Sequence, residues 1–250
     1  MLLIWLKSIF SFSIYHLLGK TSAWRTAFFM LYLTLVGILV FNIYFAYQVH
    51  QNLPIFIQHF PTLTFTKGRL ITQDKKILSI PGTDQSIIFA PEEVLPPSKE
   101  EFVEKQVVAF IRADRFYMPT VTGVSSQLIP PEIDGQINAQ TLQTYAPTLR
   151  SLLQTFAFIG AFLIVGGFFI FSFLMAWTVC FFWRNLMRAP VALSTLTRWA
   201  VFLQGPVLVL WIIHLCIGVP LFFLAVFILL NIYVQQIFNT LPDNRGSYVA

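Results

Sequence analysis

Hydrophobic and polar positions divide the chain into long apolar runs on either side of one polar stretch. Residues 27–47 are almost all apolar, and residues 152–183 contain no charged side chain. Two further apolar runs cover residues 195–217 and 220–238. About 20 apolar residues in a helix, each rising about 1.5 Å, span the hydrocarbon layer of a bilayer. The pattern therefore predicts four transmembrane helices over these four ranges.

Two of these helices are expected to depart from a straight crossing. A helix over residues 152–183 would be about 48 Å long, which is more than the hydrocarbon layer needs. We expect it to tilt, to kink near Gly166 and Gly167, or to extend beyond the bilayer at one end. Gly205 and Pro206 lie inside the third apolar run and predict a kink there.

The first 20 residues are apolar but interrupted by polar side chains. Lys7, Ser8 and Ser11 fall on one helical face, and Trp5 is one of several aromatic anchors. The charge lies in the middle of the segment and no small-residue cleavage site follows, which is unlike a signal peptide. We therefore predict an interfacial amphipathic helix over residues 1–20; whether it lies on the membrane or crosses it stays open.

The polar stretch over residues 54–149 has the pattern of a small β-rich domain. Residues 63–72 alternate around Lys67-Gly68, which predicts a hairpin. Ser98 followed by Glu101 is a capping-box pattern that opens a short helix over residues 99–106. Residues 107–117 form either one long strand or a hairpin that turns near Ala113-Asp114. The predicted fold class is an α+β integral membrane protein, with a helical bundle and this β-rich domain.

Basic side chains indicate which side of the membrane each segment faces. Lys7, Lys20 and Arg25 precede the first helix, and the predicted loop over residues 184–194 carries two arginines. The positive-inside rule places these positions in the cytoplasm. Four crossings then put the N-terminus and the polar tail over residues 239–250 in the cytoplasm, and the β-rich domain outside it.

The charge balance separates the two parts of the chain. Residues 54–149 contain eight Lys/Arg and ten Asp/Glu, a net charge of −2, whereas the rest contains eight Lys/Arg and one acid, a net charge of +7. Basic groups spread over short loops between apolar runs are typical of contact with anionic lipid. Nucleic-acid binding would require a clustered basic face, and the sequence has none.

The sequence offers no catalytic, cofactor-binding or metal-binding signature. None of the common hydrolase, zinc-protease, P-loop or dinucleotide motifs is present. His50 and His59 flank the start of the polar stretch without carboxylates or cysteines at metal-binding spacing. No apolar run contains an acid of the kind that ion-coupled transporters use. Arg112, Asp114 and Arg115 lie close enough in sequence to make a local ion pair. We assign no catalytic, cofactor or metal residue and predict that the protein is not an enzyme.

Small residues in the second apolar run predict a helix-packing seam. Ala157, Gly160, Ala161 and Gly167 fall near one helical face. Small side chains let a neighbouring helix approach closely. Glycine is also generally common in membrane helices, so these positions do not by themselves require a partner helix.

Several phrases taken together resemble a known family. They are residues 5–11 (WLKSIFS), residues 64–69 (TFTKGR), residues 112–117 (RADRFY), and Ser194, Arg198 and Pro206. In this order they resemble the bacterial membrane family catalogued as domain of unknown function number eleven eighty-nine. The resemblance covers nearly the whole chain but implies no established activity. Some members are encoded beside sugar-uptake transporters, which implies a membrane-protein partner, with a transporter as one candidate.

These observations predict a non-catalytic accessory or scaffold subunit of the bacterial cytoplasmic (inner) membrane. Its extracytoplasmic domain would be presented to a partner, in a transport-associated role. The alternative is a module that senses or binds an extracytoplasmic ligand, and a membrane enzyme of unknown type is third. The sequence names no partner, ligand or oligomeric state.

Overall fold

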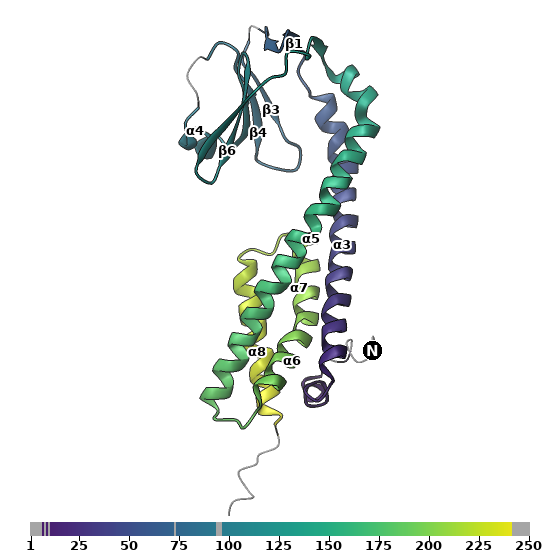
Figure 1. Ribbon diagram of the computed structural model, residues 1–250, viewed down its shortest axis with the longest axis vertical. Coiled ribbons are helices and arrows are strands. Elements are labelled where there is room, and N and C mark those ends of the chain that lie inside the picture. Colours follow the sequence, from purple (N-terminus) through teal and green to yellow (C-terminus); the bar gives the residue numbers. More distant parts are fainter. Residues whose placement is uncertain (1–6, 8, 10, 73, 94–96, 242–250) are drawn as a thin grey trace, which may run out of the picture. The chain divides into compact units, whose positions relative to one another are not determined.

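The computed structural model describes residues 7, 9, 11–72, 74–93 and 97–241. The fold is α+β, as predicted, and the chain divides into two compact units. The helical unit contains Met1–Tyr44 and Phe156–Ala250, and the β-rich unit is Phe45–Thr155. Figure 1 colours the chain from the N-terminus to the C-terminus, and each unit is described below by itself.

Among the residues that the structure describes, four helical segments are long and apolar enough to cross a membrane, which makes the chain a multi-pass membrane protein by length and composition. They are α3 (Ala23–Gln58), α5 (Ala139–Leu186), the consecutive helices α6 (Leu193–Phe202) and α7 (Gln204–Ile217), and α8 (Phe222–Asn239).

Two helices extend well beyond the predicted apolar runs. α3 continues past residue 47 and includes Pro54, and α5 begins at Ala139 and includes Pro147. Each proline removes one backbone hydrogen bond, but neither ends its helix. Helix therefore continues across both predicted boundaries of the polar domain, at residues 54 and 149. α5 is also continuous through Gly166 and Gly167.

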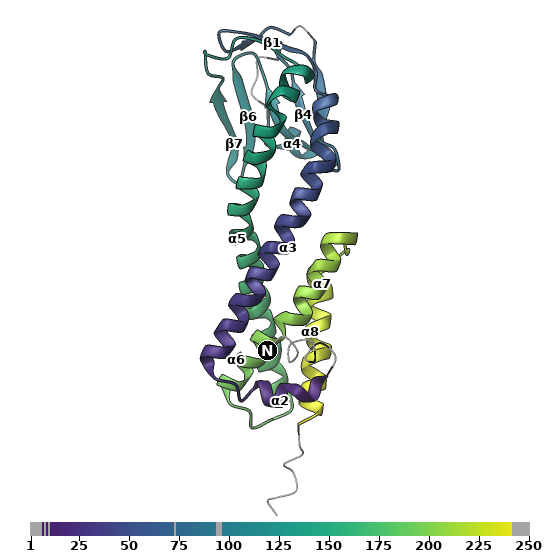
Figure 2. The same ribbon diagram turned by 90° about the vertical axis from the view of Figure 1, so that its right-hand side faces the viewer.

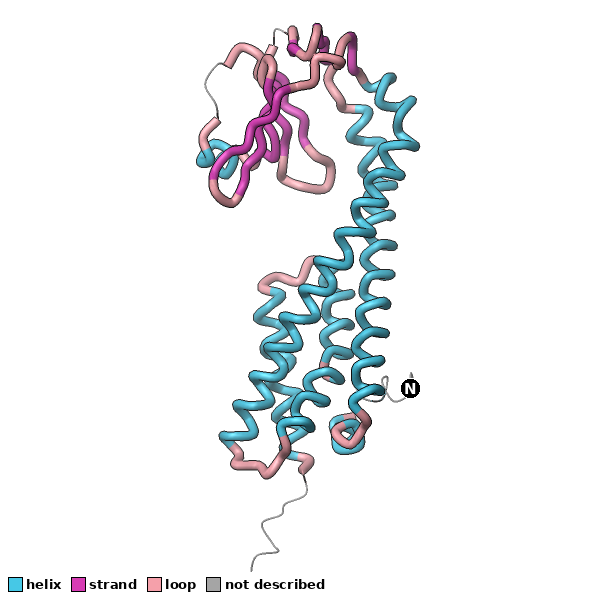
Figure 3. Tube along the Cα trace, viewed as in Figure 1, coloured by secondary structure: helices cyan, strands magenta, loops and turns pink. Residues whose placement is uncertain are grey.

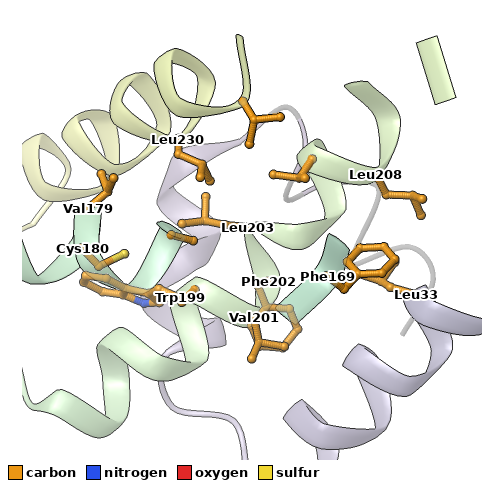
Figure 4. Packing of buried hydrophobic residues seen from close by; sticks show 14 of the residues in the cluster. Leu33, Phe169, Val179, Cys180, Trp199, Val201, Phe202, Leu203, Leu208 and Leu230 are labelled. Carbon is orange, nitrogen blue, oxygen red and sulfur yellow. The ribbon is translucent and has the colours of Figure 1, made fainter. Parts of the chain in front are cut away.

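The helical unit has one contiguous apolar core. Trp199, Leu203 and Phe169 are at most 1% exposed, and they pack with residues from every long helix of the unit (Figure 4). The predicted interruption in the third apolar run is present, because α6 ends at Phe202 and α7 begins at Gln204. Pro206 cannot donate to the carbonyl four residues before it, which explains the break.

The N-terminal segment packs against this unit. It contains the short 3-10 helix η1 (Phe12–Ile14) and α2 (Tyr15–Leu18), and α2 lies crosswise to the long helices (Figure 2). Trp199 Nε1 donates to the Tyr15 carbonyl oxygen at 2.7 Å, and Arg198 Nη1 donates to the Gly19 carbonyl oxygen at 2.7 Å. A single helix over residues 1–20 is not present in the described part, and Trp5 and Ser8 lie outside the described residues. The interfacial position of the segment stays a prediction.

The β-rich unit holds two sheets, drawn in magenta in Figure 3. The first has the order β2-β1-β8, and the second has the order β3-β4-β5-β6-β7. The strands are β1 (Leu63–Thr66), β2 (Arg69–Leu70), β3 (Lys76–Ser79), β4 (Ser86–Phe89), β5 (Val107–Ile111), β6 (Arg115–Thr120), β7 (Gly123–Leu128) and β8 (Gly135–Ile137). All neighbouring strands are antiparallel except β4 and β5.

Turn and capping residues position these strands as the sequence predicted. The Lys67-Gly68 hairpin pairs Phe65 with Leu70. Of the two alternatives for residues 107–117, the hairpin is correct, because β5 and β6 pair antiparallel. Helix α4 (Lys99–Glu104) lies in the crossover between the parallel strands β4 and β5 and carries the predicted capping box of Ser98 and Glu101. It is two residues shorter than predicted.

Candidate functional site

An apolar pocket of about 280 Å³ lies between the two sheets of the β-rich unit. Phe65 and Ile137 line it from the first sheet, and Phe116 and Leu128 from the second. The complete lining is Phe65, Ile111, Phe116, Gln127, Leu128, Ile129, Pro130, Ile133 and Ile137. Gln127 is the only lining side chain that carries a polar group.

The rim of the pocket is fixed by backbone hydrogen bonds. The Ile129 N–H donates to the Asp114 carbonyl oxygen at 2.9 Å, which ties the segment after β7 to the β5–β6 turn. The Gly68 N–H donates to the Ile133 carbonyl oxygen at 2.9 Å. Gly68 has a φ of +74°, and a Cβ there would lie 2.8 Å from the carbonyl oxygens of Ile129 and Pro130. Only glycine allows this turn to approach the rim so closely.

The size and lining of the pocket limit what it can bind. Small-molecule sites usually enclose about 300–1,000 Å³ and contain several convergent polar groups. This pocket is slightly smaller than that range, and its lining offers one amide. Its volume and lining suit one or two apolar side chains. The sequence did not reveal it, because its residues come from five strands and a connecting segment.

Arg112 is the second unusual feature of the β-rich unit. Its side chain is only 6% exposed, and Nη2 donates to Glu93 Oε2 at 3.0 Å. The guanidinium carbon lies 5.9 Å from the ring centre of Phe110 and 5.6 Å from that of Tyr117. In the described part of the chain, Nε and Nη1 have no hydrogen-bond partner. The two aromatic rings provide a favourable electrostatic environment for the buried cation.

Glu93 is the acidic partner of this cation. Its other carboxylate oxygen lies 2.9 Å from Lys75 Nζ. The hydrogen bond from Lys75 is the largest effect that lowers the pKa of Glu93, and the charges of Lys75, Arg112 and Lys105 lower it further, while partial burial opposes them. Arg112 thus pairs with Glu93 and not with Asp114, the local partner that its sequence neighbourhood offered. The crossover from β4 to β5 brings these two residues together.

The histidines named from the sequence do not gather into a metal site. His59 Nδ1 lies 2.8 Å from the Ile55 carbonyl oxygen, a local contact at the end of α3. Among the residues that the structure describes, no group of three His, Cys, Asp or Glu side chains could hold a metal ion. The acidic residues of α4 make a helical surface pair, with Lys105 Nζ 3.1 Å from Glu101 Oε1.

The predicted helix-packing residues divide into two kinds. Ala157 and Ala161 are buried in α5. A Cβ at Gly160 or Gly167 would meet no described heavy atom within 4 Å, so neither glycine is a point of close helix approach within the chain. That role belongs to Gly37 of α3, where a Cβ would lie 2.9 Å from Val165 Cγ1. The sequence pattern named two alanines that are buried in α5, but it did not name Gly37.

A buried polar pair in the helical unit was also missed. Ser172 Oγ donates to Gln204 Oε1, and Gln204 Nε2 donates to the Ala200 carbonyl oxygen at 2.9 Å. Both side chains are at most 1% exposed. Gln204 lies at the break between α6 and α7, and its position beside Gly205-Pro206 was the available signal. Because these hydrogen bonds join α5 to the break between α6 and α7, the pair serves packing specificity between α5 and the broken helix.

Comparison with known proteins gives one positive result. The family model described as "Protein of unknown function (DUF1189)" matches residues 4–238. No curated protein matches the chain, and no solved structure matches it. The match covers nearly the whole sequence, so the chain belongs to this family, which confirms the resemblance noted in the sequence.

Proposed function

We propose that this family member is a non-catalytic accessory protein of a bacterial cytoplasmic membrane. Its β-rich unit binds an extracytoplasmic segment of a membrane-protein partner, with a transporter as one candidate. The observation that carries the proposal is the apolar pocket between the two sheets. A pocket lined by eight apolar residues and Gln127 favours an apolar side chain of a protein partner over a polar metabolite.

The charge pattern supports the orientation that this role requires. Lys7, Lys20 and Arg25 precede the first long helix, and Arg184 and Arg188 follow the second. Positive charge at these ends favours a cytoplasmic N-terminus, and that orientation supports an extracytoplasmic β-rich unit. A cysteine replacing Gly82 should react with an impermeant thiol reagent in intact cells, and one replacing Arg188 should not. Labelling at residue 188 from outside would reverse the proposed orientation.

Photo-crosslinking tests the binding role directly. A photoreactive amino acid at Leu128, which lines the pocket and is 58% exposed, should yield one major product with a second protein in cells that make the chain naturally. Val103 on α4 is 70% exposed and is not part of the pocket, so it serves as the matched position. The proposal fails if neither position gives a product under conditions where the protein is correctly inserted.

Ligand sensing is the alternative role, and Arg112 favours it. A buried guanidinium with two unpartnered nitrogens in the described chain could receive a small anion after a local rearrangement. In that case the full-length protein in detergent should gain thermal stability with inorganic phosphate or acetate, and Arg112→Lys should abolish the gain. If neither anion raises the melting temperature, Arg112 no longer supports the ligand-sensing role. A membrane enzyme of unknown type has no comparable observation in its favour.

A further inference from the structure

Strand β7 is an open edge of the five-stranded sheet. It pairs with β6 along six consecutive residues, and no described strand lies on its other side. Four of its six residues are exposed. An open edge presents a row of backbone donors and acceptors that another strand can pair with, so folded proteins usually protect it.

The other sheet edges are protected and β7 is not. The opposite edge strand, β3, begins with Lys76, whose Nζ lies 3.6 Å from Asp74 Oδ2, and Lys75 beside it pairs with Glu93. The edges of the smaller sheet, β2 and β8, contain only two and three residues. The β7 sequence, Gly-Val-Ser-Ser-Gln-Leu, contains no charge and no proline, and its register with β6 has no bulge. Charge, shortness and bulges are the usual protections.

The backbone groups that point away from β6 follow from the alternation of the ladder. In an antiparallel pair, successive residues direct their N–H and C=O groups to opposite sides of the strand. Ile129 N–H bonds to the Asp114 carbonyl oxygen on the β6 side. The backbone N–H and C=O groups that point to the open edge are therefore those of Val124, Ser126 and Leu128. Pro119, which has no N–H, is paired with Val124, and this agrees with the assignment.

The apolar pocket lies at the C-terminal end of the same strand. Gln127 and Leu128 belong to β7 and also line the pocket. We propose that a partner adds an extended, uncharged segment along β7 as a sixth strand and inserts an apolar side chain into this pocket. The added strand supplies the backbone hydrogen bonds and the pocket supplies specificity, as in other cases of strand addition. A helical segment would leave the open edge unpaired. The inference rests on the proposed function and specifies how the partner is bound.

Proline substitution distinguishes the two sides of β7. Val124→Pro and Ser126→Pro each remove an N–H from the open edge without removing a bond to β6, whereas Ser125→Pro removes a bond to β6. With the photoreactive residue at Leu128, the crosslinked product should fall about tenfold in both edge variants. Each proline removes one backbone hydrogen bond to the partner strand and misaligns the hydrogen bonds next to it, which weakens binding by about this factor. Val124→Ala and Ser126→Ala, which keep the N–H, should retain it.

Folding is checked on the same purified proteins. The edge variants should melt within about 2 °C of the parent, and Ser125→Pro should melt lower. If an edge proline lowers the melting temperature, replacing the backbone amide of Ser126 by an ester removes the donor without constraining the chain. An undiminished product with this ester would overturn strand addition.

The outcomes separate the two proposals. Loss of the product in the edge variants alone supports strand addition. An undiminished product in the folded edge variants, or a product from Val103 and none from Leu128, overturns strand addition and leaves the accessory role standing. A crosslinked product with twice the mass of the chain identifies a second copy of this chain, and it contradicts the proposal that a different protein supplies the added strand. No product from either position overturns both proposals.

Discussion

The two units of this chain maintain their folds by different means. The helical unit buries one large apolar core, and no described residue in it is an Asp or Glu. The β-rich unit has two small buried clusters, one on each face of its larger sheet, and all four ion pairs of the described chain. The helical unit therefore depends on shape complementarity between helices. The β-rich unit depends on turn geometry and charge, and its stability should respond to pH.

This difference can be measured unit by unit. All six tryptophans lie outside residues 45–155, so intrinsic tryptophan fluorescence reports on the helical unit alone. Hydrogen exchange of peptides from β3 to β7 reports on the β-rich unit. Each variant below is expected to change one signal and not the other.

The largest effect is expected in the helical core. Gly37→Leu places a side chain where even a Cβ would lie 2.9 Å from Val165 Cγ1 and 3.0 Å from Phe169 Cε2. Overpacking of this kind should lower the free energy of unfolding in detergent by about 3 kcal/mol, detected by tryptophan fluorescence. Gly167→Leu is the matched control, because its position is open in the described chain. An equal loss of unfolding free energy in Gly37→Leu and Gly167→Leu would show that Gly167 also faces a packed surface.

The next effect should appear in the β-rich unit. Gly68→Ala combines a left-handed φ of +74° with a Cβ 2.8 Å from two carbonyl oxygens, so we expect a loss of about 2–3 kcal/mol. Gly135→Ala has a φ of +99° but no neighbour within 4 Å, and it should cost only about 1 kcal/mol. Faster hydrogen exchange around Ile133 in Gly68→Ala alone would confirm that the contact with the pocket rim, and not backbone strain, accounts for the difference.

The same contrast explains how much could be predicted from the sequence. Local patterns succeeded: apolar runs marked four membrane helices, Lys67-Gly68 marked a hairpin, and Ser98 with Glu101 marked a helix start. Helix ends were less accurate, because polar residues after Tyr47 hid the continuation of α3 to Gln58.

The sites were less accessible from the sequence because they depend on long-range pairing. Arg112 and Glu93 are 19 residues apart and meet only through the parallel pairing of β4 and β5. The pocket collects residues from 65 to 137. Spacing along the chain carries no information about such contacts. Gly37 similarly faces a helix more than a hundred residues away, so the small-residue pattern of α5 alone could not identify it.

A smaller effect is expected from removing one charge. Glu93→Gln leaves the buried guanidinium of Arg112 without its carboxylate, and should destabilise the β-rich unit by about 1–2 kcal/mol. This is less than for a fully buried pair, because the Glu93 side chain is 41% exposed and partly screened by solvent. Glu92→Gln is the matched control, since the neighbouring Glu92 is exposed. Hydrogen exchange of β5 and β6 should increase in Glu93→Gln and not in Glu92→Gln. Identical exchange in both would show that the two aromatic rings alone support Arg112.

The smallest effect is the pH dependence of this pair. Lys75, Arg112 and Lys105 hold the pKa of Glu93 below its ordinary value of 4.5. The unfolded chain therefore binds a proton at Glu93 more readily than the folded chain, and acid favours unfolding. The contribution of Glu93 is complete above pH 4.5 and is lost as the pH falls through the lowered folded-state pKa. The parent should thus lose stability in the β-rich unit below pH 4.5, and the difference between the parent and Glu93→Gln should shrink there.

Glu100 and Glu101, whose pKa values are also lowered, should leave a residual slope of stability against pH in the variant. Tryptophan fluorescence should change less over this range, because the described part of the helical unit contains no Asp or Glu. A constant difference between parent and variant from pH 7 to pH 3 would mean that the carboxylate charge of Glu93 does not stabilise the fold.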